Sequence, residues 1–163
     1  MKRLYLLSAI ICAIAWACGK SEEEQRAELK AKIKAKLSDN KLTQRFVDGL
    51  ISELIVKYRK AGFDVIDTSS QFPIIAFPLQ YDSVNYPIAD DMTVLGVLMR
   101  DQLKGDTLKV DFKLQWDPNI KVNDTTMGNF KLIAAEVRMM KGKERYQWVK
   151  QGEYYIKQAK LLQ

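Results

Sequence analysis

The stretch TLKVDFKLQW, Thr107 to Trp116, alternates between apolar and polar residues without a break. Successive side chains of a β-strand point to opposite faces of the sheet. The alternation therefore predicts a half-buried antiparallel strand with one apolar and one polar face. The apolar face holds Leu108, Val110, Phe112, Leu114 and Trp116, and the polar face holds Thr107, Lys109, Asp111, Lys113 and Gln115.

Two segments before this strand extend the predicted sheet. Lys104-Gly105-Asp106 indicates a turn, so residues 93–103 are expected to pair with residues 107–116 as a hairpin. With Asp91 as an N-cap the same segment also fits a helix, and that alternative stays open. Pro73 and Pro78 interrupt the extended segment 72–81, which favours a position at the edge of the sheet.

Three further strands are predicted after it. Residues 130–140 form the first, with Ile133, Ala135, Val137 and Met139 expected on one face. A turn at residues 141–143 follows, since it contains Gly142 between two lysines. Residues 145–151 and 153–158 are then expected to form the last two strands of an antiparallel meander.

Two helices are expected before the sheet. Residues 22–37 are rich in good helix formers, with acidic residues first and lysines last, but their apolar stripe is narrow. Residues 43–61 have Thr43 as a candidate N-cap and a wide apolar face that includes Leu54. We therefore expect an α+β fold, in which N-terminal helices pack on one face of an antiparallel β-meander.

The N-terminus indicates an export signal. Lys2 and Arg3 precede an apolar run, and Ala15-Trp16-Ala17 is a candidate cleavage site. The run is too short to span a bilayer as a helix. Cys18 follows, as in the lipobox of bacterial lipoproteins, although Ala15 and Trp16 depart from the usual pattern and a general signal peptidase would cut the same bond.

Lipidation would also explain the use of cysteine. Cys12 would be removed with the leader, which leaves Cys18 as the single cysteine of the mature chain. A lone thiol in an oxidising compartment is a liability unless chemistry consumes it. We therefore predict three segments: a signal peptide at residues 1–17, a lipid-anchored tether with a charged helix at 18–40, and one globular domain at 41–163.

This organisation predicts an outer-membrane lipoprotein, at the periplasmic face or on the cell surface, held in the membrane by acyl chains on Cys18. The formal net charge is +6. A basic chain often binds nucleic acid, but an exported domain rarely meets it, so no nucleic-acid partner is expected. Anionic headgroups, anionic glycans and acidic proteins remain as partners.

The residue inventory argues against catalysis. The chain has no histidine, which excludes imidazole bases and histidine-ligated metals. Cys18 is assigned to the anchor, and no phosphate-binding glycine loop occurs. Asp82, Asp90 and Asp91 could in principle bind calcium, but without alternating ligands their expected role is capping. We predict no enzyme activity, no metal and no cofactor.

A C-terminal group of basic and aromatic residues is the candidate binding surface. Trp, Tyr and Arg are the residue types that most often anchor interfaces, which favours docking of a glycan or a protein. In the alternative interpretation, the aromatic side chains belong to the core and the charges to its rim. The group consists of Arg138, Lys141, Lys143, Arg145, Tyr146, Trp148 and Lys150.

Residues 46–50 (FVDGL) and 62–67 (GFDVID) resemble the helix-then-strand unit of a group of outer-membrane lipoproteins. This group includes FlgO-like flagellar lipoproteins, CsgG-like curli lipoproteins and LpoB-like activators of cell-wall synthases. Residues 89–96 and 105–110 are similar to the hairpin that follows it there. The resemblance implies an α/β sandwich and a role in envelope assembly through protein contacts.

A second similarity, of helices followed by a curled sheet, is to the NTF2-like cone, which would imply a pocket for a small ligand. The predicted function is that of a non-catalytic envelope lipoprotein that binds another envelope protein. A small-ligand or glycan-binding module of NTF2-like type is the alternative.

Overall fold

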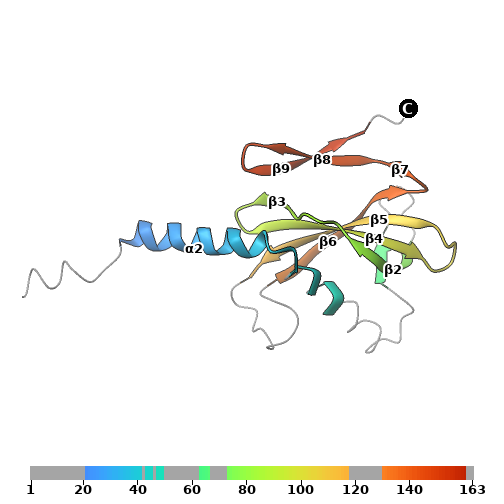
Figure 1. Ribbon diagram of the computed structural model, residues 1–163, viewed down its shortest axis with the longest axis horizontal. Coiled ribbons are helices and arrows are strands. Elements are labelled where there is room, and N and C mark those ends of the chain that lie inside the picture. Colours follow the sequence, from blue (N-terminus) through green and yellow to red (C-terminus); the bar gives the residue numbers. More distant parts are fainter. Residues whose placement is uncertain are drawn as a thin grey trace, which may run out of the picture. The chain divides into compact units, whose positions relative to one another are not determined.

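The computed structural model of the chain is mostly antiparallel β-sheet (Figure 1). It describes residues 21–41, 43–45, 47–49, 63–66, 73–117 and 130–160, with only the backbone at 63–66 and Pro73. The division into two compact units falls between Lys32 and Ile33. The predicted leader, Cys18 and most of the second predicted helix, with Leu54, lie outside the described residues.

Within the described residues, the strands form two sheets. Strands β1 to β7 make a seven-stranded sheet in the order β1-β2-β4-β5-β6-β7, and β3 pairs with β4 off this path. Strands β8 and β9 form a separate hairpin. The bounds are β1 Phe63–Ile66, β2 Pro73–Tyr81, β3 Tyr86–Ala89, β4 Met92–Asp101, β5 Thr107–Trp116, β6 Phe130–Met140, β7 Lys143–Glu144, β8 Tyr146–Gln151 and β9 Tyr154–Ala159.

Strand β5 matches its prediction residue for residue. It pairs antiparallel with β4, from Thr107 opposite Arg100 to Gln115 opposite Met92. The predicted hairpin is therefore confirmed, and the helical alternative for residues 93–103 is wrong. Strands β8 and β9 also follow the predicted segments 145–151 and 153–158 closely.

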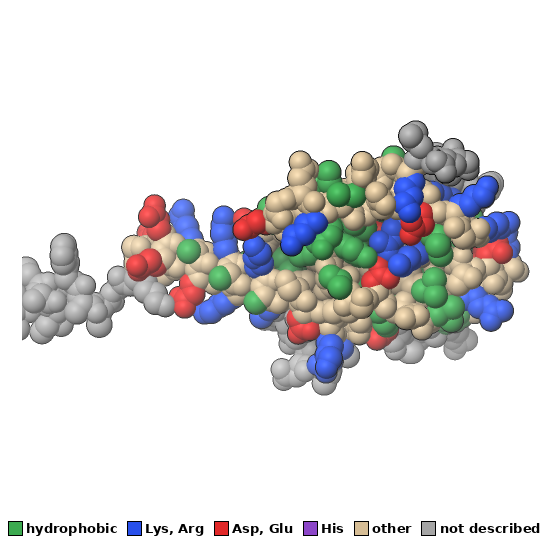
Figure 2. Space-filling view, turned by 45° about the horizontal axis from the view of Figure 1, so that its top comes forward, with side chains coloured by type: hydrophobic (Ala, Val, Ile, Leu, Met, Phe, Trp, Pro, Cys, Tyr) green, Lys and Arg blue, Asp and Glu red, His purple; other side chains and the backbone are tan. Residues whose placement is uncertain are grey.

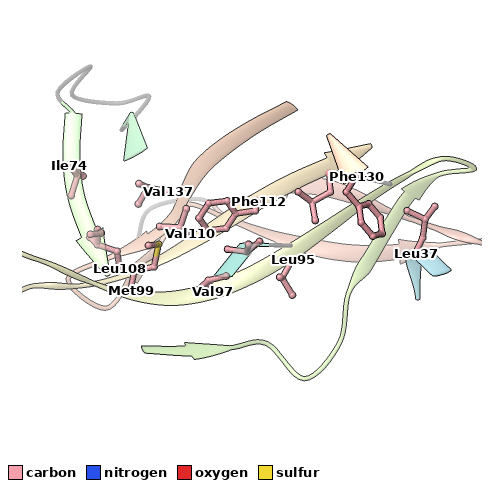
Figure 3. Packing of buried hydrophobic residues seen from close by; sticks show 13 residues of the cluster. Leu37, Ile74, Leu95, Val97, Met99, Leu108, Val110, Phe112, Phe130 and Val137 are labelled. Carbon is pink, nitrogen blue, oxygen red and sulfur yellow. The ribbon is translucent and has the colours of Figure 1, made fainter. Parts of the chain in front are cut away.

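The hydrophobic core lies on the apolar face of this sheet (Figure 3). The sheet curls far enough for β1 and β6 to contact each other, so one sheet encloses much of its own apolar face. The fully buried side chains that β4 and β5 contribute to this core are Leu95, Val97, Met99, Leu108, Val110, Phe112 and Leu114.

The predicted α+β fold is wrong. Strands hold 56% of the described residues, and only one long helix, α2 (Glu22–Leu37), and one short helix are present there. Among the described residues, the helices add only Leu37 and Val47 to the buried core cluster, with Ile33 packed against it, so no helical layer on the sheet is seen there. The α/β sandwich and the NTF2-like cone also need packed helices, so both alternatives are wrong for the same reason.

Helix α2 confirms the helix predicted at residues 22–37. A capping box starts it: Glu24 N donates to Ser21 Oγ at 3.2 Å, and Ser21 N donates to Glu24 Oε2 at 3.1 Å. Every residue from Ser21 to Lys32 is exposed. No helix in the described part of the chain has the length and apolar composition needed to cross a membrane.

The short helix begins before the predicted cap. Asp39 caps it, because Lys41 N donates to Asp39 Oδ1 at 3.0 Å, and Thr43 N already donates to Asp39 O within the helix. Thr43 is therefore not the N-cap. Its buried hydroxyl instead bonds Asn85, whose Nδ2 also donates to Leu37 O at 3.1 Å and so satisfies the end of α2.

Two β-bulges in β6 break up its predicted face: Ala135 and Val137 lie at the core as predicted, whereas Ile133 and Met139 do not. Leu114 lies opposite Leu132 and Lys113 opposite Ala134, so Ile133 is an extra residue. Arg138 is the second extra residue, between the partners of Lys109 and Val110. A bulge shifts the alternation of side chains by one residue, and Ile133 is accordingly 42% exposed instead of buried.

The predicted edge position of β2 is also wrong, because β2 lies between β1 and β4. Its prolines still occupy tolerated positions. Pro73 is the first residue of the strand, and Pro78 lies at a bulge beyond the stretch of β2 that β1 covers. Neither position requires a backbone N–H for the sheet ladder.

Candidate functional site

The C-terminal hairpin β8–β9 covers part of the polar face of the sheet. Strand β9 contacts β3, and the Trp148 indole N–H donates to Asp111 Oδ2 at 2.7 Å. Tyr86 of β3 stacks on Trp148 with ring centroids 6.2 Å apart and meets Tyr155 edge-on at 5.2 Å. Aromatic packing against β3 and a hydrogen bond to β5 therefore hold the hairpin on the sheet.

A buried cluster of charged side chains lies beneath the hairpin. Arg138 Nη2 donates to Asp82 Oδ2 at 2.6 Å, and Lys109 Nζ contacts Asp82 Oδ1 at 2.8 Å. Arg138 Nε lies 3.3 Å from Asp111 Oδ1 without the alignment of a hydrogen bond. The side chains of Arg138 and Asp111 are only 5% and 3% exposed. Two cations thus neutralise two carboxylates, as burial requires.

Burial raises the pKa values of the two carboxyl groups in this cluster, and pairing with cations lowers them. Burial raises the pKa of Asp111 to about 6, although Arg138 and Trp148 oppose the rise. Burial also raises the pKa of Asp82, but Lys109 and Arg138 outweigh it and leave that pKa below its ordinary value. Asp111 is therefore the carboxylate that changes charge nearest to neutral pH.

Gly96 provides the space that this cluster needs. It lies opposite Asp111 in the β4–β5 register. A Cβ atom at this position would lie 2.1 Å from Asp82 Oδ2 and 2.7 Å from Arg138 Nη2. Both distances are far below van der Waals contact, so the ion pair can cross the strand only over a glycine.

A pocket of about 240 Å³ lies between the hairpin and the sheet. Tyr146, Trp148 and Tyr155 of the hairpin line one side of it. Figure 2 shows hydrophobic side chains gathered in a hollow, with basic and acidic side chains at its rim. The remaining lining residues come from β3 to β6 and β9, and they are Ile88, Val94, Asp111, Lys113, Glu136 and Lys157.

The structure separates the seven residues of the predicted binding surface. Arg138 and Tyr146 are buried, at 4% and 5% exposure. Trp148 is half-buried and joins them under the hairpin. Arg145 is also half-buried, and the remaining three, which lie at the β6–β7 turn and late in β8, are exposed: Lys141, Lys143 and Lys150.

Several residues of this site were not predicted from the sequence. Two of them, Asp111 and Gly96, are nevertheless residue types that are unusual at their positions in a strand. Asp111 is an aspartate in the middle of a strand, where this residue type is depleted. Gly96 lies in the interior of the neighbouring strand, where glycine often marks a close approach. Asp82, for which the sequence predicted a capping role, lies outside any strand and instead pairs with Lys109 and Arg138.

Asp90 and Asp91 lie at the turn between β3 and β4 and are engaged there. The Tyr154 hydroxyl donates to Asp90, and Gln115 Nε2 donates to Asp91 Oδ2 at 2.8 Å. Trp116 N also donates to Asp91 O at 2.7 Å. Among the described side chains, no group of three or more His, Cys, Asp or Glu is placed to hold a metal ion.

Comparison with known proteins identifies no relative. No family model, no curated protein and no solved structure matches the chain. The resemblance to FlgO-like, CsgG-like and LpoB-like lipoproteins therefore stays a prediction, and the fold that it implied is contradicted by the sheet. The function rests on the N-terminal sequence and on the site.

Proposed function

We propose that this chain is an exported, lipid-anchored envelope protein whose β-domain acts by binding another envelope protein, without a reaction of its own. The observation that carries the proposal is the order of its parts. A leader and Cys18 precede α2, and α2 is exposed at every residue up to Lys32. With 16 residues, a helix is about 24 Å long, which suits a spacer between an anchored cysteine and a domain.

The charged cluster supports binding over catalysis. A general acid or base must reach a substrate proton within hydrogen-bond distance. Asp111 is 3% exposed, and both Trp148 and Arg138 engage it. The hydrogen bond from Trp148 to Asp111 holds the hairpin on the sheet. The hairpin in turn forms part of the surface that a partner would contact.

A small-ligand or glycan-binding role is the second candidate, and the pocket under the hairpin favours it. Three aromatic side chains line the pocket, which suits an apolar or ring-shaped group. Its volume of about 240 Å³ is below the roughly 300–1,000 Å³ of pockets for drug-sized ligands. The occupant would therefore be small, such as one side chain of a partner.

The anchor is tested by replacing each cysteine in turn. Wild-type protein should fractionate with membranes, and the mature N-terminus should carry acyl chains by mass spectrometry. Cys18→Ala should move the protein to the soluble exported pool. Cys12→Ala, which changes only the leader, is the matched control and should leave the protein in the membrane fraction. Membrane association of the Cys18→Ala protein, or a bare thiol at the mature N-terminus, would contradict the proposal.

The partner is tested by crosslinking intact cells and purifying the wild-type chain. Envelope proteins should be captured by the wild type at levels well above those captured by an unrelated lipoprotein with the same anchor. Equal capture by both would show that the β-domain adds no binding of its own.

A further inference from the structure

Among the described residues, one of the charged side chains that line the pocket under the hairpin has no partner of opposite charge. Four charged residues line it, namely Asp111, Lys113, Glu136 and Lys157. Lys157 pairs with Glu136 and lies 4.1 Å from the centroid of the Tyr146 ring. Asp111 pairs with Arg138 and accepts the Trp148 hydrogen bond. Three of the four lining charges are therefore neutralised within the protein.

Lys113 is the remaining charge, and its position in the sheet explains why it has no ion-pair partner among the described residues. Its cross-strand neighbours are Val94 on β4 and Ala134 on β6, both apolar. Among the described residues, no carboxylate oxygen lies within 4 Å of its ammonium group. Lys113 is half-buried, so part of its hydration is lost and a counter-ion inside the pocket would restore a favourable interaction.

The rest of the lining is suited to an apolar group. Tyr155 and Trp148 of the hairpin line the hollow together with Ile88 and Val94 of the sheet, and Tyr86 packs against both hairpin rings. Tight packing of rings around an apolar group is the main source of affinity in small sites. One cation beside an apolar hollow is complementary to one carboxylate attached to an apolar body.

We propose that this pocket binds a small apolar carboxylate, with Lys113 as the residue that contacts the carboxylate and Trp148 and Tyr155 as the residues that contact the apolar body. This inference rests on the proposed binding function but does not depend on the lipid anchor. The same chemistry is available from a free acid or from the C-terminal residue of a polypeptide, and the two sources are separated below.

The test uses two probes of the same shape, N-acetyl-leucine and N-acetyl-leucinamide, which differ in the carboxylate charge. Both are titrated into the full chain in lipid nanodiscs. Trp16→Phe and Trp116→Phe together leave Trp148 as the single tryptophan of the chain, so its fluorescence reports on the pocket whether or not the leader is removed. The acid should bind at least about tenfold more tightly than the amide, since a charge-assisted hydrogen bond is worth that ratio or more.

Variants then assign the charge preference to one residue. Lys113→Gln should remove the preference for the acid, and Lys113→Arg should retain it. Lys131→Gln is the matched control, because Lys131 is an exposed lysine on β6 outside the pocket lining, and it should bind as the wild type does. Equal binding of acid and amide, equal effects of Lys113→Gln and Lys131→Gln, or no binding of the acid at about 10 mM, too weak to be specific, would each overturn the proposal.

A third probe, the peptide Ala-Ala-Leu with a free C-terminus, separates the two sources. Tighter binding of the peptide than of N-acetyl-leucine supports the proposal with a polypeptide terminus as occupant. Weaker binding of the peptide supports it with a free acid. If none of the three probes binds, the pocket inference is wrong. The result of the cysteine substitutions, and therefore the proposed anchor, would not be affected.

Discussion

The two faces of strand β5 are built in different ways. The apolar face is a row of leucine, valine and phenylalanine side chains that are 0% exposed. The polar face holds Asp111 at its centre, which is also buried but bonds to Trp148 and Arg138. The first face is stabilised by many small, additive contacts, and the second by a few strong contacts that depend on one another.

The difference lies also in the distance along the chain. The apolar face follows from a local alternation within ten residues. On the polar face, Asp111 meets Trp148, 37 residues later, and Arg138 meets Asp82 across 56 residues. A local pattern reveals one face directly, whereas the other exists only once four separate segments have come together.

The largest expected effect comes from removing Arg138. Arg138→Met leaves Asp111 buried without its cation, and the free energy of unfolding should fall by about 3–5 kcal/mol. The double variant with Asp111→Leu removes the stranded charge as well, so its loss should be clearly smaller than the sum of the two single losses. Urea unfolding measures all three variants.

The apolar face provides the control for this cycle. Leu108 and Leu114 are both fully buried, and six residues of strand separate them by about 20 Å. Losses from Leu108→Val and Leu114→Val should therefore add to within about 0.5 kcal/mol. Additive losses on the polar face as well would show that its charges do not act as one cluster.

The sequence alone reveals the part of the fold that depends on local pattern. The alternation in β5, the hairpin turn at Gly105 and the helix α2 all match their predicted residues. The face of β6 could not be predicted, because the bulges at Ile133 and Arg138 follow from its pairing with β5. No alternation within β6 itself encodes a bulge.

The site was predictable only in part. Arg138, Tyr146 and Trp148 were singled out from the sequence as a surface or, in the alternative, as core aromatic residues with a charged rim. The burial of Tyr146 agrees with the alternative, but the burial of Arg138 agrees with neither. Aromatic residues on a two-stranded hairpin cannot be assigned to solvent or to another sheet from their spacing. Arg138 donates to Asp82 and Trp148 to Asp111. These partners are far apart in the sequence, so their pairing could not be predicted from it.

The second prediction uses pH to separate the two faces. The pKa of Asp111 rises from its ordinary 3.8 to about 6 in the folded protein, so the folded state binds this proton more tightly than the unfolded state does. The resulting stability is present below pH 4 and is lost as pH rises to about 6, an effect of up to about 3 kcal/mol. Asp82, whose pKa is lowered, acts in the opposite direction and only below about pH 4.

Asp111→Asn should remove the loss of stability between about pH 4 and pH 6. Chemical denaturation of wild type and variant across this window measures it. Phe112→Ala, on the apolar face, should lower stability at every pH without changing the slope, because it removes no titrating group. An unchanged slope in Asp111→Asn would show that Asp111 is not the group that titrates.

The smallest of the three effects on stability is expected at Gly96. The substitution tests whether the charge cluster on the polar face is what requires a glycine in β4. Gly96→Ala places a Cβ 2.1 Å from Asp82 Oδ2, so Asp82 and Arg138 must move apart. Overpacking of this kind costs about 1–3 kcal/mol, offset in part by the lower entropy that alanine has in the unfolded chain.

The Asp82→Ala background distinguishes a clash with the ion pair from a general intolerance of β4 for a side chain at this position. Without the Asp82 carboxylate the nearest clash is gone. Arg138 Nη2, at 2.7 Å from the added Cβ, can also move away, because its hydrogen bond to Asp82 is lost while the pairing of Arg138 with Asp111 remains. Gly96→Ala should then cost less stability than it does in the wild type, because the lower unfolded-state entropy of alanine is no longer outweighed by the clash. An equal cost in both backgrounds would mean that the backbone of β4, and not the charge cluster, requires glycine there.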